Sequence, residues 1–284
     1  RGSPPVHQAR HRRRARLTLM QNHALARWRA HEKSIGAWLT MSDLYSAEVL
    51  AQLGFDWVCF DLQHGLMDYS HLTHLLPAIA QARVTPLVRV AANQPDQIGK
   101  ALDAGAQGVI VPLVNTVEDA RKAVAACRYP PAGARSCGPI RAAMHEGLAY
   151  LQTANEQVAC VVMIETEEGL RNVETIAATD GVDGLFVGPM DLCYGLGLAP
   201  GSFNDARFQQ ALGTILAACT KHDRAAGIFG YTPEMAAQSL QAGFVFASAG
   251  TDGNFLRAGA AQALEAARGD GKAAAPGAPP DSRY

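Results

Sequence analysis

The chain has 284 residues, of which 48% are hydrophobic and 18% are charged, and its formal net charge is −1. This length is ordinary for an α/β barrel, and the apolar fraction is sufficient for a complete hydrophobic core. The nearly neutral charge gives no general reason to expect binding to nucleic acid or to an anionic membrane.

The first 28 residues include the run RHRRRARL and show little hydrophobic periodicity. We expect residues 1–28 to form a disordered basic tail. An Arg-rich, acid-poor start resembles a transit peptide, and a basic tail can also bind anions. A remnant of cloning, or translated upstream sequence with Met20 as the true start, is the explanation we favour.

Beyond this tail, short apolar runs alternate with longer helical patterns. We expect strands at Ile35–Leu39, Asp56–Phe60, Pro86–Val90, Gly108–Pro112, Val161–Ile164, Val182–Val187, Ala225–Phe229 and Phe244–Ser248. Helical patterns lie at Ser46–Leu53, Tyr69–Ala82, Gln94–Ala104, Val117–Cys127, Ala142–Thr153 and Gly169–Ala177. Eight strands that alternate with helices predict an α/β fold, a closed (β/α)8 TIM-type barrel. An open doubly wound sheet is the alternative, but no GxGxxG follows the first strand.

We expect residues 29–268 to form this single barrel domain and the Gly/Ala/Pro-rich residues 269–284 to form a second disordered tail. The six cysteines include no CxxC pair, and several lie inside apolar runs. This pattern favours buried thiols in a reducing compartment. No apolar run approaches the roughly 20 residues of a transmembrane helix, so we expect a cytoplasmic protein.

Two acidic residues follow apolar runs in the second half of the chain. Glu165 comes directly after Val161–Ile164, and Asp191 comes shortly after Val182–Val187. The connection has the length of one βαβ unit, so the two strands should pair or lie close together. Two carboxylates at that separation repel, and a shared divalent cation such as Mg²⁺ or Mn²⁺ relieves the repulsion. Alternatively, both acids simply cap the helices that follow.

In a barrel, the polar residues at the strand ends gather on one face. Here they are Asp61, Gln63, His64, Arg89, Glu165 and Asp191. An inward-facing Arg89 needs an anion, either a ligand or one of the carboxylates of Glu165 and Asp61. Asp61 precedes His64 by three residues, and a carboxylate that binds an imidazole fixes its tautomer and raises its basicity.

Five segments carry a family resemblance: FDWVCFDLQHG, PLVRV, ALDAGAQGVIVPLV, MIETEEGL and DGLFVGPMDL. In this order and at this spacing they resemble the HpcH/HpaI aldolases, a family within the pyruvate- and phosphoenolpyruvate-binding barrels, over about residues 34–260. Such enzymes cleave 4-hydroxy-2-oxo acids reversibly to pyruvate and an aldehyde without a Schiff-base lysine. The resemblance implies a class II aldolase that uses Mg²⁺, Mn²⁺ or Co²⁺ to stabilise a pyruvate enolate. It also implies a homo-oligomer, either a hexamer or a trimer of dimers.

The resemblance also implies roles for single residues. Glu165 and Asp191 would bind the metal, and His64 would be the catalytic base. Arg89 would stabilise the enolate oxygen. Asp103, in the ALDAGA segment, matches an acid that raises the basicity of the histidine, either within the chain or across a subunit interface.

The expected substrate-binding residues lie beside the metal ligands: Met163, Gly188, Pro189, Met190 and Asp191. Backbone N–H groups of Gly188–Asp191 would hold the substrate carboxylate. Met163 stands where well-known members often have Gln, and Met190 stands where they have a small residue. Both changes make the pocket more apolar, so we expect neutral or apolar aldehydes. Arg135 is the one other candidate for binding a distal carboxylate, although its loop could equally be structural.

Three other functions remain open. A related enolate lyase could act as a decarboxylase or cleave an acyl group as citrate lyase does, and product analysis would distinguish it. A non-catalytic barrel that binds a keto acid would show no turnover. RNA binding through the basic residues 10–16 would be lost when the tail is deleted.

Overall fold

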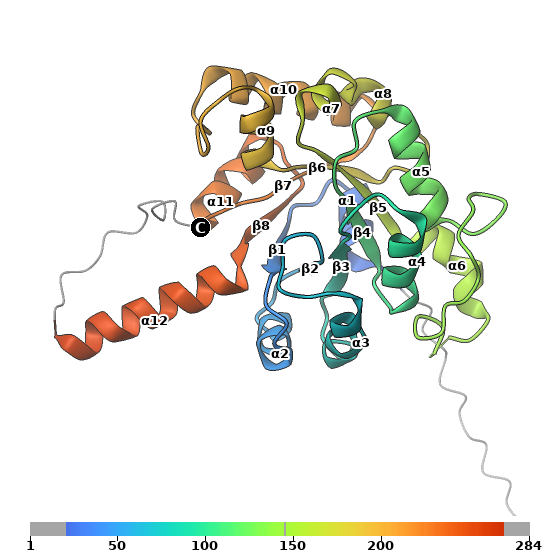
Figure 1. Cartoon of the computed structure of the whole chain (residues 1–284), viewed down its shortest axis with the longest axis horizontal. Helices are drawn as coiled ribbons and strands as arrows, with labels where there is room; N and C mark the ends of the chain where they lie inside the picture. The colour runs from blue at the N-terminus through green and yellow to red at the C-terminus, as the bar shows by residue number, and fades with distance from the viewer. Residues whose placement is uncertain (1–20, 145, 270–284) are drawn as a thin grey trace, which may run out of the picture.

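The computed structural model describes residues 21–144 and 146–269, in which eight parallel strands close into a barrel (Figure 1). Each strand pairs with the next in sequence, and β8 pairs with β1. The strands are β1 (Ser34–Leu39), β2 (Trp57–Asp61), β3 (Thr85–Arg89), β4 (Gly108–Val111), β5 (Ala159–Ile164), β6 (Gly184–Val187), β7 (Ala225–Ile228) and β8 (Phe246–Thr251). The predicted (β/α)8 barrel is therefore confirmed.

Helices surround the barrel, and most of them cover its outside. They are α1 (His23–Arg29), α2 (Leu44–Gln52), α3 (Tyr69–Ala78), α4 (Pro95–Asp103), α5 (Val117–Cys127), α6 (Ala149–Gln157), α7 (Glu167–Arg171), α8 (Val173–Ala177), α9 (Pro189–Gly195), α10 (Ala206–Lys221), α11 (Pro233–Ala242) and α12 (Asp252–Arg268). None of the helices in the described part of the chain is both long enough and apolar enough to cross a membrane.

Short polar side chains begin several of these helices. At α5, the Thr116 hydroxyl accepts a hydrogen bond from the Asp119 N–H (3.1 Å), and the Asp119 carboxylate accepts one from the Thr116 N–H (3.0 Å). This reciprocal capping satisfies N–H groups that have no partner inside the helix. Thr166 caps α7 in a similar way, through the Gly169 N–H.

Two predicted helices differ from those observed. Helix α6 begins only at Ala149, because the residues before it form turns and Gly147 has a φ of +58°. The helix predicted at Gly169–Ala177 is divided into α7 and α8 at Asn172, whose side chain donates to the Asn115 carbonyl (2.8 Å).

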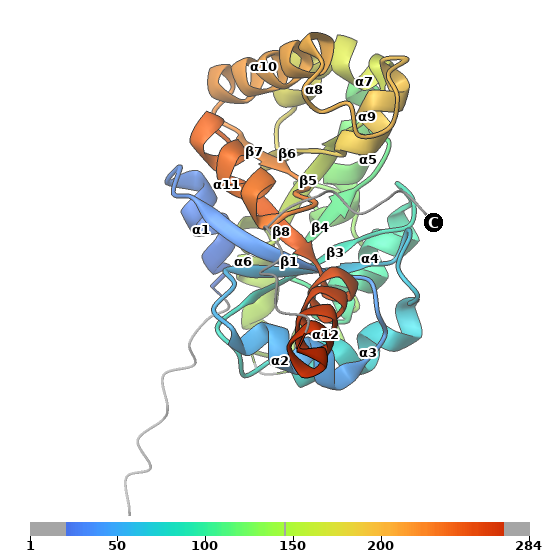
Figure 2. The ribbon, with the colours of Figure 1, turned by 90° about the vertical axis from the view of Figure 1, so that its left-hand side faces the viewer.

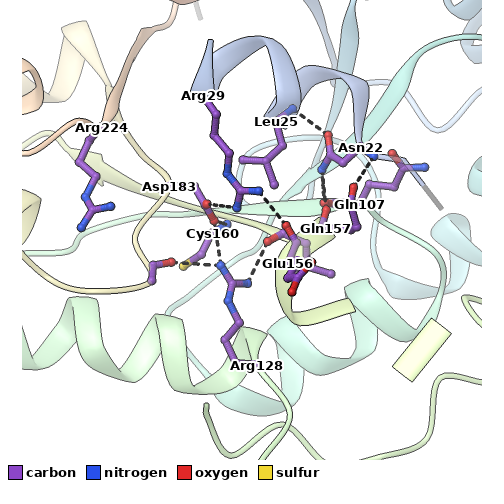
Figure 3. Close-up of polar contacts among 12 residues, drawn as sticks. Asn22, Leu25, Arg29, Gln107, Arg128, Glu156, Gln157, Cys160, Asp183 and Arg224 are labelled. Atoms are coloured by element: carbon purple, nitrogen blue, oxygen red, sulfur yellow. Dashed lines mark hydrogen bonds and ion pairs between the residues drawn. The ribbon is translucent and has the colours of Figure 1, made fainter. Parts of the chain in front are cut away.

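Helix α1 closes the end of the barrel where the strands begin. Its N-cap residue, Asn22, donates side-chain hydrogen bonds to the carbonyls of Gln107 (2.7 Å) and Gln157 (2.9 Å), as Figure 3 shows. At the other end of the helix, Arg29 pairs with Asp183 (3.0 Å). These contacts attach α1 to the segments that lead into β4, β5 and β6.

The indole of Trp28 extends this closure into the barrel. It stacks on Phe246 with a centroid distance of 4.2 Å and donates to the Ser34 hydroxyl (2.9 Å). The prediction that residues 1–28 form a disordered tail is therefore wrong for residues 23–28, which are helical. The rest of that predicted tail up to residue 20, and the predicted tail from residue 270, lie outside the described residues.

Four large aromatic side chains pack among smaller apolar residues in the barrel interior. Trp38, Trp57, Phe186 and Phe246 are all buried and are joined by stacked, tilted or edge-to-face ring contacts. A second and larger apolar cluster lies between the strands and the helices. This apolar packing leaves the carboxyl ends of the strands as the place for polar side chains.

Helix α12 projects away from the barrel in Figure 1 and points toward the viewer in Figure 2. Its first residue, Asp252, is buried and accepts hydrogen bonds from the backbone N–H groups of Thr40 (3.0 Å) and Met41 (2.9 Å). Farther along the helix, Leu256 and Leu264 are exposed. The start of α12 is therefore fixed to the barrel, while most of its length is not packed against this chain.

Candidate active site

The carboxyl ends of β2, β3, β5 and β6 carry the predicted polar residues. Asp61 and Arg89 are the last residues of β2 and β3 and are direct partners in the parallel ladder. Glu165 directly follows β5, and Gly188 directly follows β6. Strands β5 and β6 pair as predicted, with Ile164 opposite Val187.

Arg89 binds Asp61 through two hydrogen bonds. The distances are 2.8 Å from Nε to Oδ1 and 2.5 Å from Nη2 to Oδ2, and both side chains are buried. The Arg89 guanidinium also lies 5.0 Å from the centroid of the Trp38 ring, and the Trp38 indole donates to Asp61 (3.2 Å). Burial alone would raise the pKa of Asp61, but the hydrogen bonds and charge of Arg89 outweigh it and hold the pKa below its usual value. Of the two structural partners predicted for Arg89, the structure selects Asp61.

The predicted contact between Asp61 and the imidazole of His64 is not formed. Asp61 Oδ1 instead accepts the backbone N–H groups of Gln63 (3.0 Å) and His64 (3.2 Å). Arg89 and Trp38 are also bonded to this carboxylate, so its two oxygens are already occupied by donors other than the His64 imidazole. The imidazole of His64 is exposed, and no hydrogen bond joins it to another described residue.

Glu165 has a hydrogen bond on one side and a closely packed glycine on the other. Its Oε1 accepts the Leu113 N–H at 2.8 Å, and a Cβ built on Gly188 would lie 2.6 Å from Oε2. A larger residue directly after β6 would therefore displace the Glu165 carboxylate. Glu165 is not a helix cap, because Thr166 caps α7.

Burial raises the pKa of Glu165 to about 7. The negative charge of Asp191 contributes to this rise, while the Leu113 N–H and the charge of Arg89 oppose it. The carboxylate of Asp191 is thus close enough to repel that of Glu165. Asp191 lies in the first turn of α9 and is exposed.

The predicted substrate-binding residues lie next to these acids. Met163 is a buried, inward-facing residue of β5, and its Cε would be 3.1 Å from a Cβ on Gly188. Pro189 begins α9 and is buried, and Met190 is half-buried. The structure therefore brings together Met163, Glu165 and the start of α9.

Asp103 and Arg135 lie elsewhere. Asp103 is the last residue of α4, shortly before β4 begins, so it lies at the opposite end of the barrel from His64. It pairs with Arg135 (2.6 Å), whose guanidinium lies over the ring of Tyr129 (4.5 Å). Within this chain, Asp103 cannot tune His64, and Arg135 cannot bind a distal substrate carboxylate. The bond to Asp103 favours a structural role for Arg135 within its own chain.

The donor set at Glu165 and Asp191 fits a hard divalent cation. Among the described residues there is no group of three or more His, Cys, Asp or Glu side chains that could enclose a metal. Two carboxylates with no thiolate or imidazole suit Mg²⁺ or Mn²⁺, which keep positions for water and substrate oxygens. The raised pKa of Glu165 is consistent with a site at which a cation offsets negative charge.

Sequence reasoning missed Leu113 and Trp38. The alternation of β1 could have placed Trp38 inside the barrel, next to the strand ends. Nothing in the sequence around Leu113 indicates that its N–H points at Glu165, since backbone N–H groups have no signature of their own.

Comparison with known proteins places the chain among the barrels that it resembles. Residues 34–258 match the HpcH/HpaI aldolase/citrate lyase family. The chain belongs to this family. A 4-hydroxy-2-oxo-heptane-1,7-dioate aldolase of Shigella flexneri is 39% identical over 254 residues, which cover 88% of this chain and 94% of the relative. A hydroxypyruvate/pyruvate aldolase of Rhizorhabdus wittichii is 37% identical over 242 residues, with coverage of 85% and 96%.

A solved structure supports the same conclusion. The crystal structure of an HpcH/HpaI aldolase/citrate lyase family protein from Burkholderia cenocepacia J2315 superposes with a TM-score of 0.83 at 37% identity. The superposed region covers 87% of this chain and 100% of the Burkholderia chain. The five segments that carry the resemblance thus belong to a family match over nearly the whole barrel.

Proposed function

We propose that this protein is a class II aldolase, a carbon–carbon lyase that cleaves a 4-hydroxy-2-oxo acid reversibly to pyruvate and an aldehyde. The observation that carries the proposal is the pair Glu165 and Asp191 at the ends of the paired strands β5 and β6, with Arg89 near enough to influence Glu165. The aldolase names of relatives that cover most of the chain support the same reaction.

Glu165 and Asp191 would hold a divalent metal, Mg²⁺, Mn²⁺ or Co²⁺. When bound, such an ion polarises a carbonyl and offsets developing negative charge. Gly188 keeps the space beside Glu165 Oε2 open. The backbone N–H groups of Met190 and Asp191 would bind the substrate carboxylate, because the first N–H groups of a helix have no partner within it, and Pro189 has none to donate.

His64 is proposed as the general base. It removes the proton of the 4-hydroxyl, directly or through water, and the C3–C4 bond breaks. The bonding electrons form the enolate of pyruvate, and protonation at C3 completes the product. Arg89, fixed by Asp61, stabilises the negative oxygen of the enolate.

A screen with pyruvate, a panel of aldehydes and Mg²⁺, Mn²⁺ or Co²⁺ tests this function, with products identified by mass spectrometry. A chelator should abolish condensation, and added metal should restore it. Asp191→Ala should be inactive, while Asp180→Ala, which alters an exposed acid of the loop before β6, should be fully active. Full activity of the wild type in excess chelator would contradict the proposal. Acyl cleavage or decarboxylation without aldol products would instead favour the related enolate lyase.

We also propose a homo-oligomer, with Asp103 of one subunit facing His64 of another. Within one chain the two residues lie at opposite ends of the barrel, and the His64 ring is exposed. The unpacked length of α12, with Leu256 and Leu264 exposed, supports association. Light scattering after size-exclusion chromatography would show a monomer if this is wrong.

We propose the cytoplasm as the compartment. All six cysteines are free, and five of them are buried. Buried free thiols are typical of proteins in a reducing environment.

A further inference from the structure

Leu113 has an unusual backbone conformation beside the candidate metal site. It lies between β4 and α5 with a φ of +54°. The other described non-glycine residues with positive φ are His31 and Asp223, and both types are enriched in this region. Leucine is not enriched there, because its Cβ crowds the following carbonyl and its side chain has no polar atom to form a compensating local hydrogen bond.

Packing of the leucine side chain does not explain this conformation. The side chain is 53% exposed, whereas the next residue, Val114, is fully buried. The contact that the conformation makes is the hydrogen bond from the Leu113 N–H to Glu165 Oε1, at 2.8 Å. A strained conformation of this kind persists only where surrounding structure determines it.

Two further contacts hold this turn against the segment after β5. The Thr166 hydroxyl bonds to Asn115 Oδ1 at 2.5 Å, and the Asn172 side chain donates to the Asn115 carbonyl at 2.8 Å. The turn after β4 and the residues around Glu165 therefore form one connected unit. The N–H of Leu113 therefore cannot turn away from Glu165 unless these contacts of Asn115 also break.

We propose that the Leu113 peptide is the positioning group of the metal ligand Glu165. Its N–H bonds to Oε1 and so fixes the orientation of the carboxylate, while no described residue donates a hydrogen bond to Oε2, which lies beside Gly188. Glu165 would thus be held in one orientation for a cation. This inference deepens the proposed function and rests on the proposal that Glu165 and Asp191 bind a divalent metal.

Replacing Leu113 by its α-hydroxy acid, (S)-2-hydroxy-4-methylpentanoic acid, tests the inference by removing the N–H and keeping the side chain. The Kd for Mn²⁺, measured by calorimetry on the full-length protein, should rise about 10–100-fold, as for other partners that orient a metal ligand. The matched control is the same replacement at Leu66, an exposed leucine whose N–H donates to the Thr40 carbonyl (2.7 Å). That Kd should stay within about twofold of the wild-type value.

Leu113→Gly is the conservative variant, because glycine keeps the N–H and adopts positive φ without strain. It should bind Mn²⁺ like the wild type, and circular dichroism would verify the fold of each variant. If the hydroxy-acid protein binds Mn²⁺ as tightly as the wild type or more tightly, or if Leu113→Gly loses affinity equally, the positioning role is overturned while the proposed function stands. If the wild type binds no divalent metal, both are overturned.

Discussion

Arg89 and Asp61 lie opposite each other on paired strands and are joined by two hydrogen bonds in a buried site. Asp61 therefore binds Arg89 and not the imidazole of His64, which its sequence spacing predicts as its partner. The carboxylate fixes the guanidinium and the turn after β2, and it leaves the imidazole free.

The pair should make Asp61 essential for stability. Asp61→Asn leaves the Arg89 charge without a buried counter-charge, and breaking such a pair typically costs ~3–5 kcal/mol. Urea unfolding at pH 7 measures this cost. The control is Asp180→Asn, at a fully exposed acid of the loop before β6, which should change stability by less than about 0.5 kcal/mol.

The same pair predicts a pH dependence. The pKa of Asp61 is lowered in the folded protein, so its contribution to stability is present above its unfolded pKa, near 3.8. That contribution is lost as the pH falls through the lower folded pKa. The difference in unfolding free energy between wild type and Asp61→Asn should therefore shrink in acid. A constant difference down to pH 2 would argue against the ion pair as its source.

His64 should matter for turnover rather than for binding. His64→Ala should lower kcat for aldol cleavage by roughly 10²–10⁴-fold, the usual contribution of a general base. Pyruvate affinity, measured by calorimetry, should be unchanged because the ring is not a proposed ligand of the keto acid. His74→Ala, at an exposed histidine of α3, is the matched control. A kcat within twofold of wild type would assign the base to another group.

Glu165 should make the metal-free protein less stable as the pH rises. Its pKa is about 7, above the ordinary 4.5, so the folded state favours the neutral acid. The neutral Glu165 carboxyl therefore adds to the free energy of unfolding below about pH 4.5, and this contribution is lost as the pH rises through about 7. The total loss is ~3 kcal/mol. In chelator, Glu165→Gln should escape this loss and be the more stable protein at pH 8.

Urea unfolding between pH 4.5 and 8 measures the effect. Glu167→Gln, two residues farther along and exposed, should follow the wild type. Parallel curves for the wild type and Glu165→Gln would mean that the environment of Glu165 does not disfavour its charge.

The fold could be predicted because buried parallel strands are continuous apolar runs. Strand β5, from Ala159 to Ile164, is buried at every position. Helix α1 was missed because its seven residues carry only two large apolar side chains, Leu25 and Trp28, after an Arg-rich stretch. What fixes it is contact with distant segments such as Gln107 and Gln157, and a sequence pattern cannot contain those contacts.

The position of the acids at strand ends could also be predicted, but their partners could not. The choice of Arg89 between Asp61 and Glu165 depends on strand register, which pairs β2 directly with β3. The separation of Asp103 from His64 depends on α4 running back to the far end of the barrel. Both are properties of the closed structure.

The aldehyde preference is the last prediction. Among the described residues, Arg89 is the only Lys or Arg that ends a strand, and it is bound to Asp61. Arg135 is bound to Asp103 at the other end of the barrel. Met163 and Met190 add adaptable apolar surface beside the acids. We therefore expect neutral or apolar aldehydes to react better than succinic semialdehyde, over a broad range, because one methylene in an apolar pocket discriminates only about 10–200-fold.

Met163→Gln should add a donor beside the bound keto acid and lower the KM for pyruvate in the condensation direction. Met144→Gln is the matched control, because Met144 is exposed and lies in the turns before α6, between Arg135 and that helix. Its KM should equal that of the wild type. Competition between propionaldehyde and succinic semialdehyde, read by mass spectrometry, gives the specificity ratio directly. A strong preference of the wild type for succinic semialdehyde would contradict the apolar-pocket argument, and a neighbouring subunit would then have to supply the cation.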